Sequence, residues 1–287
     1  DNIAIGPSEG EGITTGLDNI AVGSGSFNAA TTGKGNIGIG KESLHDVTTG
    51  THNIAIGSGS QANNITGLYD ISIGFNAMSG SKSDNFDNIA IGNEAMRTGD
   101  VSGNNNIGIG TKALDNLSGG SHNIAIGSGS MMKGTNNGYR NVAIGVSTLE
   151  DATSASGSIA IGHMAARKHT TGNANIAIGS GSMGKGVAVS GPDTGDNIGI
   201  GSYALEDLTT GNGNVGIGYQ AGDELTTGGY SIAIGYQAMS AGITTGDANI
   251  AIGRLALKNV VGASNNIAIG YRALRDTTDT ATRNIAI

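Results

Sequence analysis

The chain has 287 residues, of which 52 are glycine, 13% are charged and 3% are aromatic, and it carries a net charge of −8 without any cysteine. So few bulky side chains exclude a large spherical core, and the lack of cysteine excludes disulfides and thiolate metal sites. The acidic balance, without a basic block, argues against nucleic acid or an anionic membrane as partner, and no apolar run of about 18 residues is present that could cross a membrane.

A five-residue motif, Asn-Ile-Ala-Ile-Gly, recurs along the whole chain in seventeen copies. Its first position falls at residues 2, 19, 36, 53, 70, 88, 106, 123, 141, 158, 175, 197, 214, 231, 249, 266 and 284, in steps of 17 or 18 residues and one step of 22. A unit this short cannot bury a core alone, so neighbouring units must stack. We therefore predict one continuous all-β repeat region over residues 1–287, a parallel β-roll or β-solenoid of 17–18-residue coils, cut from a longer chain.

Positions two and four of the motif carry the large apolar side chains. Position two is Ile except at Val142 and Val215, and position four is Ile except at Val22. Residues two apart on a strand share one face. Stacked coils would align these side chains into ladders about 4.8 Å apart, and we expect this isoleucine ladder to fill the coil interior.

Position three is only ever Ala, Gly or Ser, although a solvent-facing strand position would tolerate larger polar residues. Something therefore approaches this face closely, either the opposite wall of a narrow roll or another subunit. We favour the second, because the isoleucines already supply an interior. The predicted intersubunit face is Ala4, Ala21, Gly38, Ala55, Ser72, Ala90, Gly108, Ala125, Ala143, Ala160, Ala177, Gly199, Gly216, Ala233, Ala251 and Ala268.

The remaining motif positions have structural explanations. The glycine at position five is typical of a corner with positive φ, and the asparagine at position one is expected to form a hydrogen-bonded ladder when coils stack. After the glycine, many copies carry a pair such as Ala113-Leu114 and then a turn such as Thr48-Thr49-Gly50. We interpret these as a second strand and a second corner in a flattened roll. The extra residues of the 22-residue step, from Val187 to Asp196, should form a loop.

This combination of Asn-Ile-Ala-Ile-Gly, an Ala-Leu pair and a glycine-containing turn resembles the head repeats of trimeric autotransporter adhesins (YadA-like), and similar repeats occur in bacteriophage tail fibres. The resemblance covers the whole chain. It implies a left-handed parallel β-roll, a homotrimer around one axis, and a role in attachment to surfaces. The adhesin repeat is typically shorter than 17 or 18 residues, so the resemblance does not decide between a bacterial adhesin and a bacteriophage fibre. The resemblance carries no receptor-binding residue over to this chain.

The polar residues do not form a recognisable catalytic or metal motif. We interpret His45, His52, His122, His163 and His169 as scattered surface residues, with His52 and His122 at the same place in their coils. The turn aspartates Asp18, Asp87, Asp193, Asp196 and Asp247 lack the calcium-binding nonapeptide pattern. The hexapeptide period of solenoid acyltransferases is absent, and adjacent threonines point to opposite faces, unlike the flat Thr-x-Thr array of an ice-binding surface.

The sequence thus favours a structural segment of an extracellular fibre or adhesin, at a cell surface or on a virion, over an enzyme. Its expected partners are further copies of itself in a homotrimer and a surface receptor, protein or glycan, with no nucleic acid, no membrane insertion within this segment and no cofactor. The alternatives are a bacteriophage tail fibre shaft and the subunit of an extracellular filament stacked head to tail, because uncapped solenoid ends expose strand edges.

Overall fold

The computed structural model describes residues 1–8, 13–29, 32–80, 86–98, 102–134, 137–186, 195–241, 245–259, 261–276 and 282–287. The chain forms two compact units, Asp1–Arg140 and Asn141–Ile287. All the regular secondary structure of the described residues is β, with one short strand per coil. These described residues include no helix that is long and apolar enough to cross a membrane.

Each motif copy forms its strand at positions two to four. In the first unit the strands are β1 (Ile3–Ile5), β2 (Ile20–Val22), β3 (Ile37–Ile39), β4 (Ile54–Ile56), β5 (Ile71–Ile73), β6 (Ile89–Ile91), β7 (Ile107–Ile109) and β8 (Ile124–Ile126). In the second unit they are β9 (Val142–Ile144), β10 (Ile159–Ile161), β11 (Ile176–Ile178), β12 (Ile198–Ile200), β13 (Val215–Ile217), β14 (Ile232–Ile234), β15 (Ile250–Ile252), β16 (Ile267–Ile269) and β17 (Ile285–Ala286).

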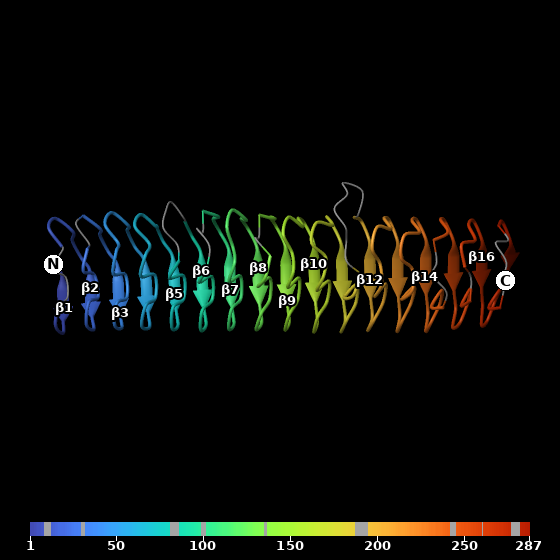
Figure 1. Ribbon diagram of the computed structural model, residues 1–287, viewed down its shortest axis with the longest axis horizontal. Coiled ribbons are helices and arrows are strands. Elements are labelled where there is room, and N and C mark those ends of the chain that lie inside the picture. The colour runs from blue at the N-terminus through green and yellow to red at the C-terminus, as the bar shows by residue number, and fades with distance from the viewer. Residues whose placement is uncertain are drawn as a thin grey trace. The chain divides into compact units, whose positions relative to one another are not determined.

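Successive strands within each unit pair in parallel and in register. Each residue pairs with the residue at the same motif position in the next strand. Ile37 of β3 pairs with Ile54 of β4, and Ile198 of β12 pairs with Val215 of β13. Figure 1 shows the strands of each unit side by side and pointing the same way. The prediction of a parallel β-solenoid with coils of about 17 residues is confirmed.

The face of each strand that we predicted to lie inside the coil lies outside it, and the face predicted to lie outside is buried. From β2 to β16 the small residue at position three is buried, for example Ala55 and Ala125 at 0% exposure, whereas the flanking isoleucines are half-buried or exposed. The isoleucines therefore lie on the outside of the coil and the small residues line its interior. The prediction that position three forms an intersubunit face is wrong for these fifteen residues; only Ala4, in β1, is exposed.

The opposite wall of the coil explains why position three must be small. A Cβ atom added at Gly108 would lie 3.1 Å from Cε of Met96, and one added at Gly216 would lie 2.8 Å from Cγ of Leu205. These large side chains occupy the ninth position of their coils and are fully buried. Since protein interiors are close-packed, a Leu or Met from one wall leaves room for only Ala, Gly or Ser on the other.

The wall that carries these large side chains is built from turns, so the predicted second strand is absent from the described residues. Positive φ angles recur at the seventh and ninth positions and just before the motif, as at Lys112 (58°), Leu114 (55°) and His122 (61°). The left-handed conformation destabilises a non-glycine residue by about 1–2 kcal/mol. Full burial of a leucine side chain stabilises the fold by about 1.5–3 kcal/mol, which offsets that cost. At the corner, the position-five glycine has φ between 122° and 140° in every complete copy, as predicted.

The asparagine ladder is confirmed. Asn36 donates from Nδ2 to the carbonyl of Gly50, in the Thr-Thr-Gly turn of the same coil, at 2.8 Å, and its backbone N–H donates to Oδ1 of Asn19 in the preceding coil at 2.9 Å. The same two bonds recur at Asn214 in the second unit. Asn36 and Asn214 therefore each tie the turn of their own coil to its strand and their own coil to the preceding one.

Asp70 occupies a ladder position and is fully buried. Its carboxylate accepts hydrogen bonds from the backbone N–H of Asn88 at 2.9 Å and from Nδ2 of Asn64 at 3.2 Å. Burial raises the pKa of Asp70 to about 7, although these hydrogen bonds oppose the shift. The predicted loop of the 22-residue step, with Pro192, lies almost wholly in residues 187–194, outside the described residues.

Candidate functional site

The outward side chains of positions two and four form a surface that we name the isoleucine stripe. Position-two residues are mostly half-buried, as in β2 to β9. Position-four residues are 36–40% exposed at Ile39, Ile56, Ile73, Ile126, Ile144, Ile200, Ile217, Ile252 and Ile269. Because identical neighbours in the ladder cover the sides of each isoleucine, this exposure corresponds to a side chain whose tip faces solvent. Each unit therefore carries an apolar stripe two side chains wide.

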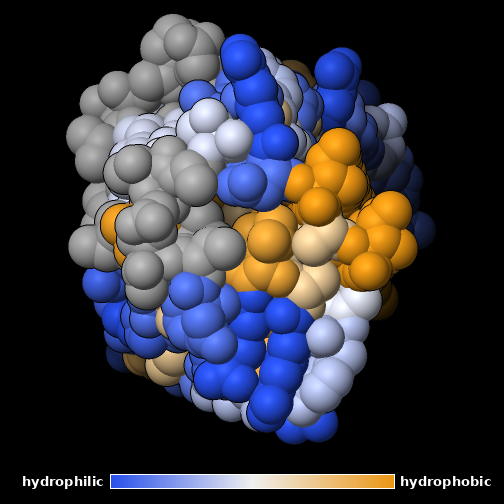
Figure 2. All heavy atoms as spheres, turned by 90° about the vertical axis from the view of Figure 1, so that its right-hand side faces the viewer, coloured by the Kyte–Doolittle hydropathy of each residue, from blue (hydrophilic) through white to orange (hydrophobic). Residues whose placement is uncertain are grey.

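A surface of this kind is unusual for a single chain. Monomeric soluble proteins rarely expose contiguous apolar patches of more than a few hundred Å², and larger ones mark interaction sites. Figure 2 looks onto the C-terminal end and shows hydrophobic residues on one flank and across the middle of that end, between hydrophilic regions. The isoleucine stripe is therefore the candidate interaction surface of the described residues.

A second feature, the aromatic ladder, occupies the corner after the motif glycine in the second unit. Tyr219 and Tyr236 stack with centroids 5.4 Å apart, and Tyr203 and Tyr219 form an edge-to-face pair with centroids 6.1 Å apart. The guanidinium of Arg254 lies 5.5 Å from the ring of Tyr236 and 5.8 Å from that of Tyr271. Cation–π contacts of this kind are worth about 0.5–1 kcal/mol each at exposed sites, so the ladder braces successive coils.

The sequence analysis missed this ladder. Tyr219, Tyr236, Arg254 and Tyr271 all occupy the sixth position of their coils. Aligning the copies on that position, as we did for positions one to five, would have revealed it.

The histidines do not gather into one site, and one of them is buried. His52 and His122 lie exposed at equivalent places, as predicted, and His52 stacks on Tyr69 at 5.2 Å. His163 is exposed and His45 is half-buried. His169 is only 3% exposed, and neither of its ring nitrogens has a hydrogen-bond partner among the described residues. The prediction of a surface location is therefore wrong for His169, which occupies an interior position filled by Leu117, Leu208 and Leu225 in other coils.

Burial lowers the pKa of His169 to about 4, from 6.5 in an unfolded chain. The unfolded chain therefore binds a proton more readily, so the stability contributed by neutral His169 is complete above pH 6.5 and is lost as the pH falls towards 4. We expect His169→Leu to reduce the loss of unfolding free energy between pH 7 and pH 4.5 by about 2–3 kcal/mol. Urea unfolding at both pH values and one protein concentration measures this. His122→Gln should leave the loss unchanged, and an unaltered loss in His169→Leu would contradict the assignment.

The turn aspartates have a structural role where they are described. Asp18, Asp87 and Asp196 adopt positive φ between 57° and 60° at the residue before the motif. Asp247 accepts a hydrogen bond from the backbone of Gly229 at 2.8 Å, and Asp193 lies outside the described residues. No group of three His, Asp or Glu residues in the described part of the chain is arranged to hold a metal ion.

A scan against protein-family models gave no match for this chain, and a search of curated protein sequences found none that is significantly similar.

Proposed function

We propose that this chain is a segment of an attachment fibre, a homotrimeric β-solenoid of the adhesin type, and that the isoleucine stripe is the surface by which the chains assemble. The observation that carries the proposal is the exposure of the stripe in both units, at Ile56 and Ile126 and at Ile200 and Ile269. The segment acts outside the cell, at a cell surface or on a virion, and holds variable turns on a stiff scaffold. It is a binding and structural element with no catalytic role.

The occupant of the stripe is a further copy of this chain. A partner must present apolar side chains at the same spacing, one pair for every coil, over many coils. An identical chain meets this requirement because its own strands repeat with the same inter-strand distance, about 4.8 Å. Three chains around one axis bury every stripe against its neighbours, and a closed ring of this kind leaves none exposed.

A bacteriophage tail fibre shaft is the alternative with the same architecture, because a shaft also needs a stiff trimer of repeated coils. A filament stacked end to end is the other alternative. It would pair the strand edges that an uncapped solenoid exposes at its ends. The filament leaves the stripe uncovered, so we prefer the trimer.

The test is the mass of the chain in solution, measured by sedimentation equilibrium and by native mass spectrometry. The proposal predicts a mass of three chains of 28.4 kDa each, independent of concentration over the micromolar range. A stable monomer would overturn it, and a ladder of masses that grows with concentration would favour the filament.

A further inference from the structure

The coil that begins with β10, residues 158–174, has a weak point in the asparagine ladder; we name it the β10 coil. Its first position is Ser158, where fourteen of the seventeen copies have asparagine. The Ser158 hydroxyl donates to the carbonyl of Gly172 at 3.3 Å and accepts from the backbone N–H of Asn175 at 3.3 Å. Asparagine makes the same two bonds in the first unit at 2.8 and 2.9 Å. The ladder therefore continues through this coil on longer bonds.

The interior of the β10 coil holds a histidine where other coils hold a large apolar residue. His169 is at the twelfth position, which Leu208 fills two coils further on, and it is 3% exposed. The residues at the same position in the two adjacent coils are Ala152 and Gly186, and both are buried. These small neighbours leave room for an imidazole ring, but they offer it no polar side chain.

Buried polar atoms without a hydrogen-bond partner gather at this coil. Among the described residues, neither ring nitrogen of His169 has a partner, nor do Oγ1 of Thr171 and Nδ2 of Asn175. At the equivalent pair of positions in the first unit, Asn64 donates from Nδ2 to Oδ2 of Asp70 at 3.2 Å. His169 and Asn175 occupy those two positions here and make no such bond. Since unsatisfied buried polar groups destabilise a fold, these atoms weaken the β10 coil.

The charged residues around His169 are paired with one another or lie at the surface. Nε of Arg167 donates to Glu150 at 2.9 Å, and Lys185 pairs with Glu206 at 2.9 Å. In the β10 coil and the two coils stacked on it, the described titratable side chains other than His169 are Glu150, Asp151, His163, Arg167, Lys168, Lys185 and Asp196.

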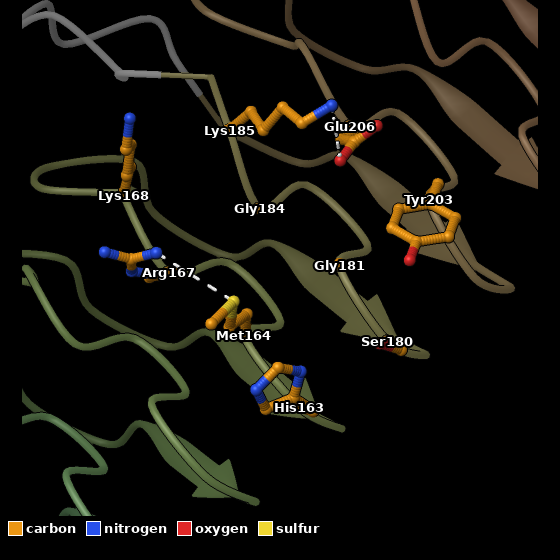
Figure 3. Close-up of a pocket in the computed structure, with 10 residues that line it drawn as sticks. All are labelled: His163, Met164, Arg167, Lys168, Ser180, Gly181, Gly184, Lys185, Tyr203 and Glu206. Atoms are coloured by element: carbon orange, nitrogen blue, oxygen red, sulfur yellow. Dashed lines mark hydrogen bonds and ion pairs between the residues drawn. The ribbon is translucent and has the colours of Figure 1, made fainter.

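Figure 3 shows where the cationic members of this set lie. Arg167, Lys168 and Lys185 are among the residues that line a cavity of about 310 Å³ on the turn-built wall, and His169 is not among them. Burial is accordingly the cause of the lowered pKa of His169, without a contribution from a charged neighbour. No described carboxylate is therefore placed to stabilise a protonated ring.

We infer that the β10 coil is an acid-operated hinge, in which protonation of His169 opens this coil while the coils further along the solenoid stay folded. A buried imidazolium without a counter-charge is strongly destabilised, and the ring reaches water when its coil opens. Because a coil of a solenoid contacts only its neighbours, one coil can open without global unfolding. The solenoid is then stiff at neutral pH and bends at one place in acid.

The pH range of the hinge follows from the two protonation equilibria of His169. Its pKa is about 4 in the closed coil and 6.5 in an exposed one. The preference for the closed coil is therefore complete above pH 6.5 and is lost as the pH falls towards 4. Between pH 7 and pH 4.5 the two pKa values correspond to a rise of about 50-fold in the equilibrium constant for opening.

The experiment is amide hydrogen exchange of the whole chain, read by mass spectrometry at pH 7 and pH 4.5 and corrected for the intrinsic pH dependence of exchange. Peptides over residues 159–176 report the β10 coil through hydrogen-bonded amides such as those of Ile159 and Gly162. We expect their protection to fall about 50-fold between the two pH values. Protection over residues 106–122, where Leu117 fills the twelfth position, should stay the same.

Two variants separate the proton from the weak ladder. His169→Leu supplies the residue that other coils have at the twelfth position and should abolish the fall in protection. Ser158→Asn restores the ladder residue, so it should raise protection of the β10 coil at both pH values and leave the ratio between them at about 50. His122→Gln replaces an exposed histidine and should behave as the natural chain.

Two results would overturn the inference. An equal fall in protection over residues 106–122 would show that acid acts on the whole chain, and an undiminished fall in His169→Leu would show that another group takes up the proton. The hinge goes beyond the proposed attachment function and does not depend on assembly, because His169 lies inside its own coil. A monomer that opens at this coil in acid removes the trimer alone, and a trimer that does not open removes the hinge alone.

Discussion

Replacing Ile56 and Ile126 together with glutamate is expected to convert the proposed trimer into single chains. Both side chains lie on the isoleucine stripe, at 37% and 36% exposure in the single chain. In the proposed trimer each glutamate would lie in an apolar interface without a partner, and an unpaired buried charge costs several kcal/mol. Three chains would carry six such charges. Sedimentation velocity should therefore show one species near the mass of a single chain.

The fold should survive this double substitution, because the stripe faces solvent in the single chain. Circular dichroism should show an unchanged β spectrum. Thr49→Glu with Thr210→Glu adds the same two charges at exposed turn positions and should leave the mass at three chains. A double glutamate variant that still sediments as a trimer would show that the chains assemble through another surface.

Replacing Ala125 with leucine should destabilise the coil itself. Ala125 is fully buried inside its own chain. At the equivalent position one coil earlier, even a Cβ atom on Gly108 would lie 3.1 Å from Met96. Overpacking of this kind costs about 1–3 kcal/mol, occasionally more. We expect Ala125→Leu to lower the free energy of unfolding, measured by guanidinium denaturation, by at least about 2 kcal/mol.

Thr49→Leu is the matched control, since Thr49 is exposed in a turn of the same unit. A surface change of this kind usually alters stability by no more than about 0.5 kcal/mol. Had position three faced a neighbouring subunit, Ala125→Leu would impair assembly and leave the single chain as stable as before. Equal unfolding free energies in the two variants would therefore contradict the interior placement.

Much of the fold could be predicted from the sequence because the repeat determines local structure and register together. The period places each Ile-x-Ile strand beside the next copy, and the glycine and asparagine at its ends have direct physical explanations that the φ angles and the hydrogen bonds of Asn36 confirm. These features depend on neighbouring residues and on the coil stacked alongside. They do not depend on which face of the strand is buried.

The choice of face could not be predicted, because alternation shows only which residues share a face. Hydrophobicity alone places the isoleucines inside. The deciding contribution comes from the opposite wall, where Leu114 and Met96 adopt positive φ angles of 55° and 50° that a sequence pattern assigns to glycine. Once those side chains fill the interior, only a small residue fits across from them.

The measurement that tests the account most directly uses the absence of cysteine from the natural chain. Ile126→Cys and Ala125→Cys place one thiol on adjacent residues of β8, the first outward and the second inward. Under mild oxidation the account predicts disulfide-linked chain pairs on a denaturing gel for Ile126→Cys and none for Ala125→Cys. Cross-linking through Ala125→Cys, with none through Ile126→Cys, would contradict it.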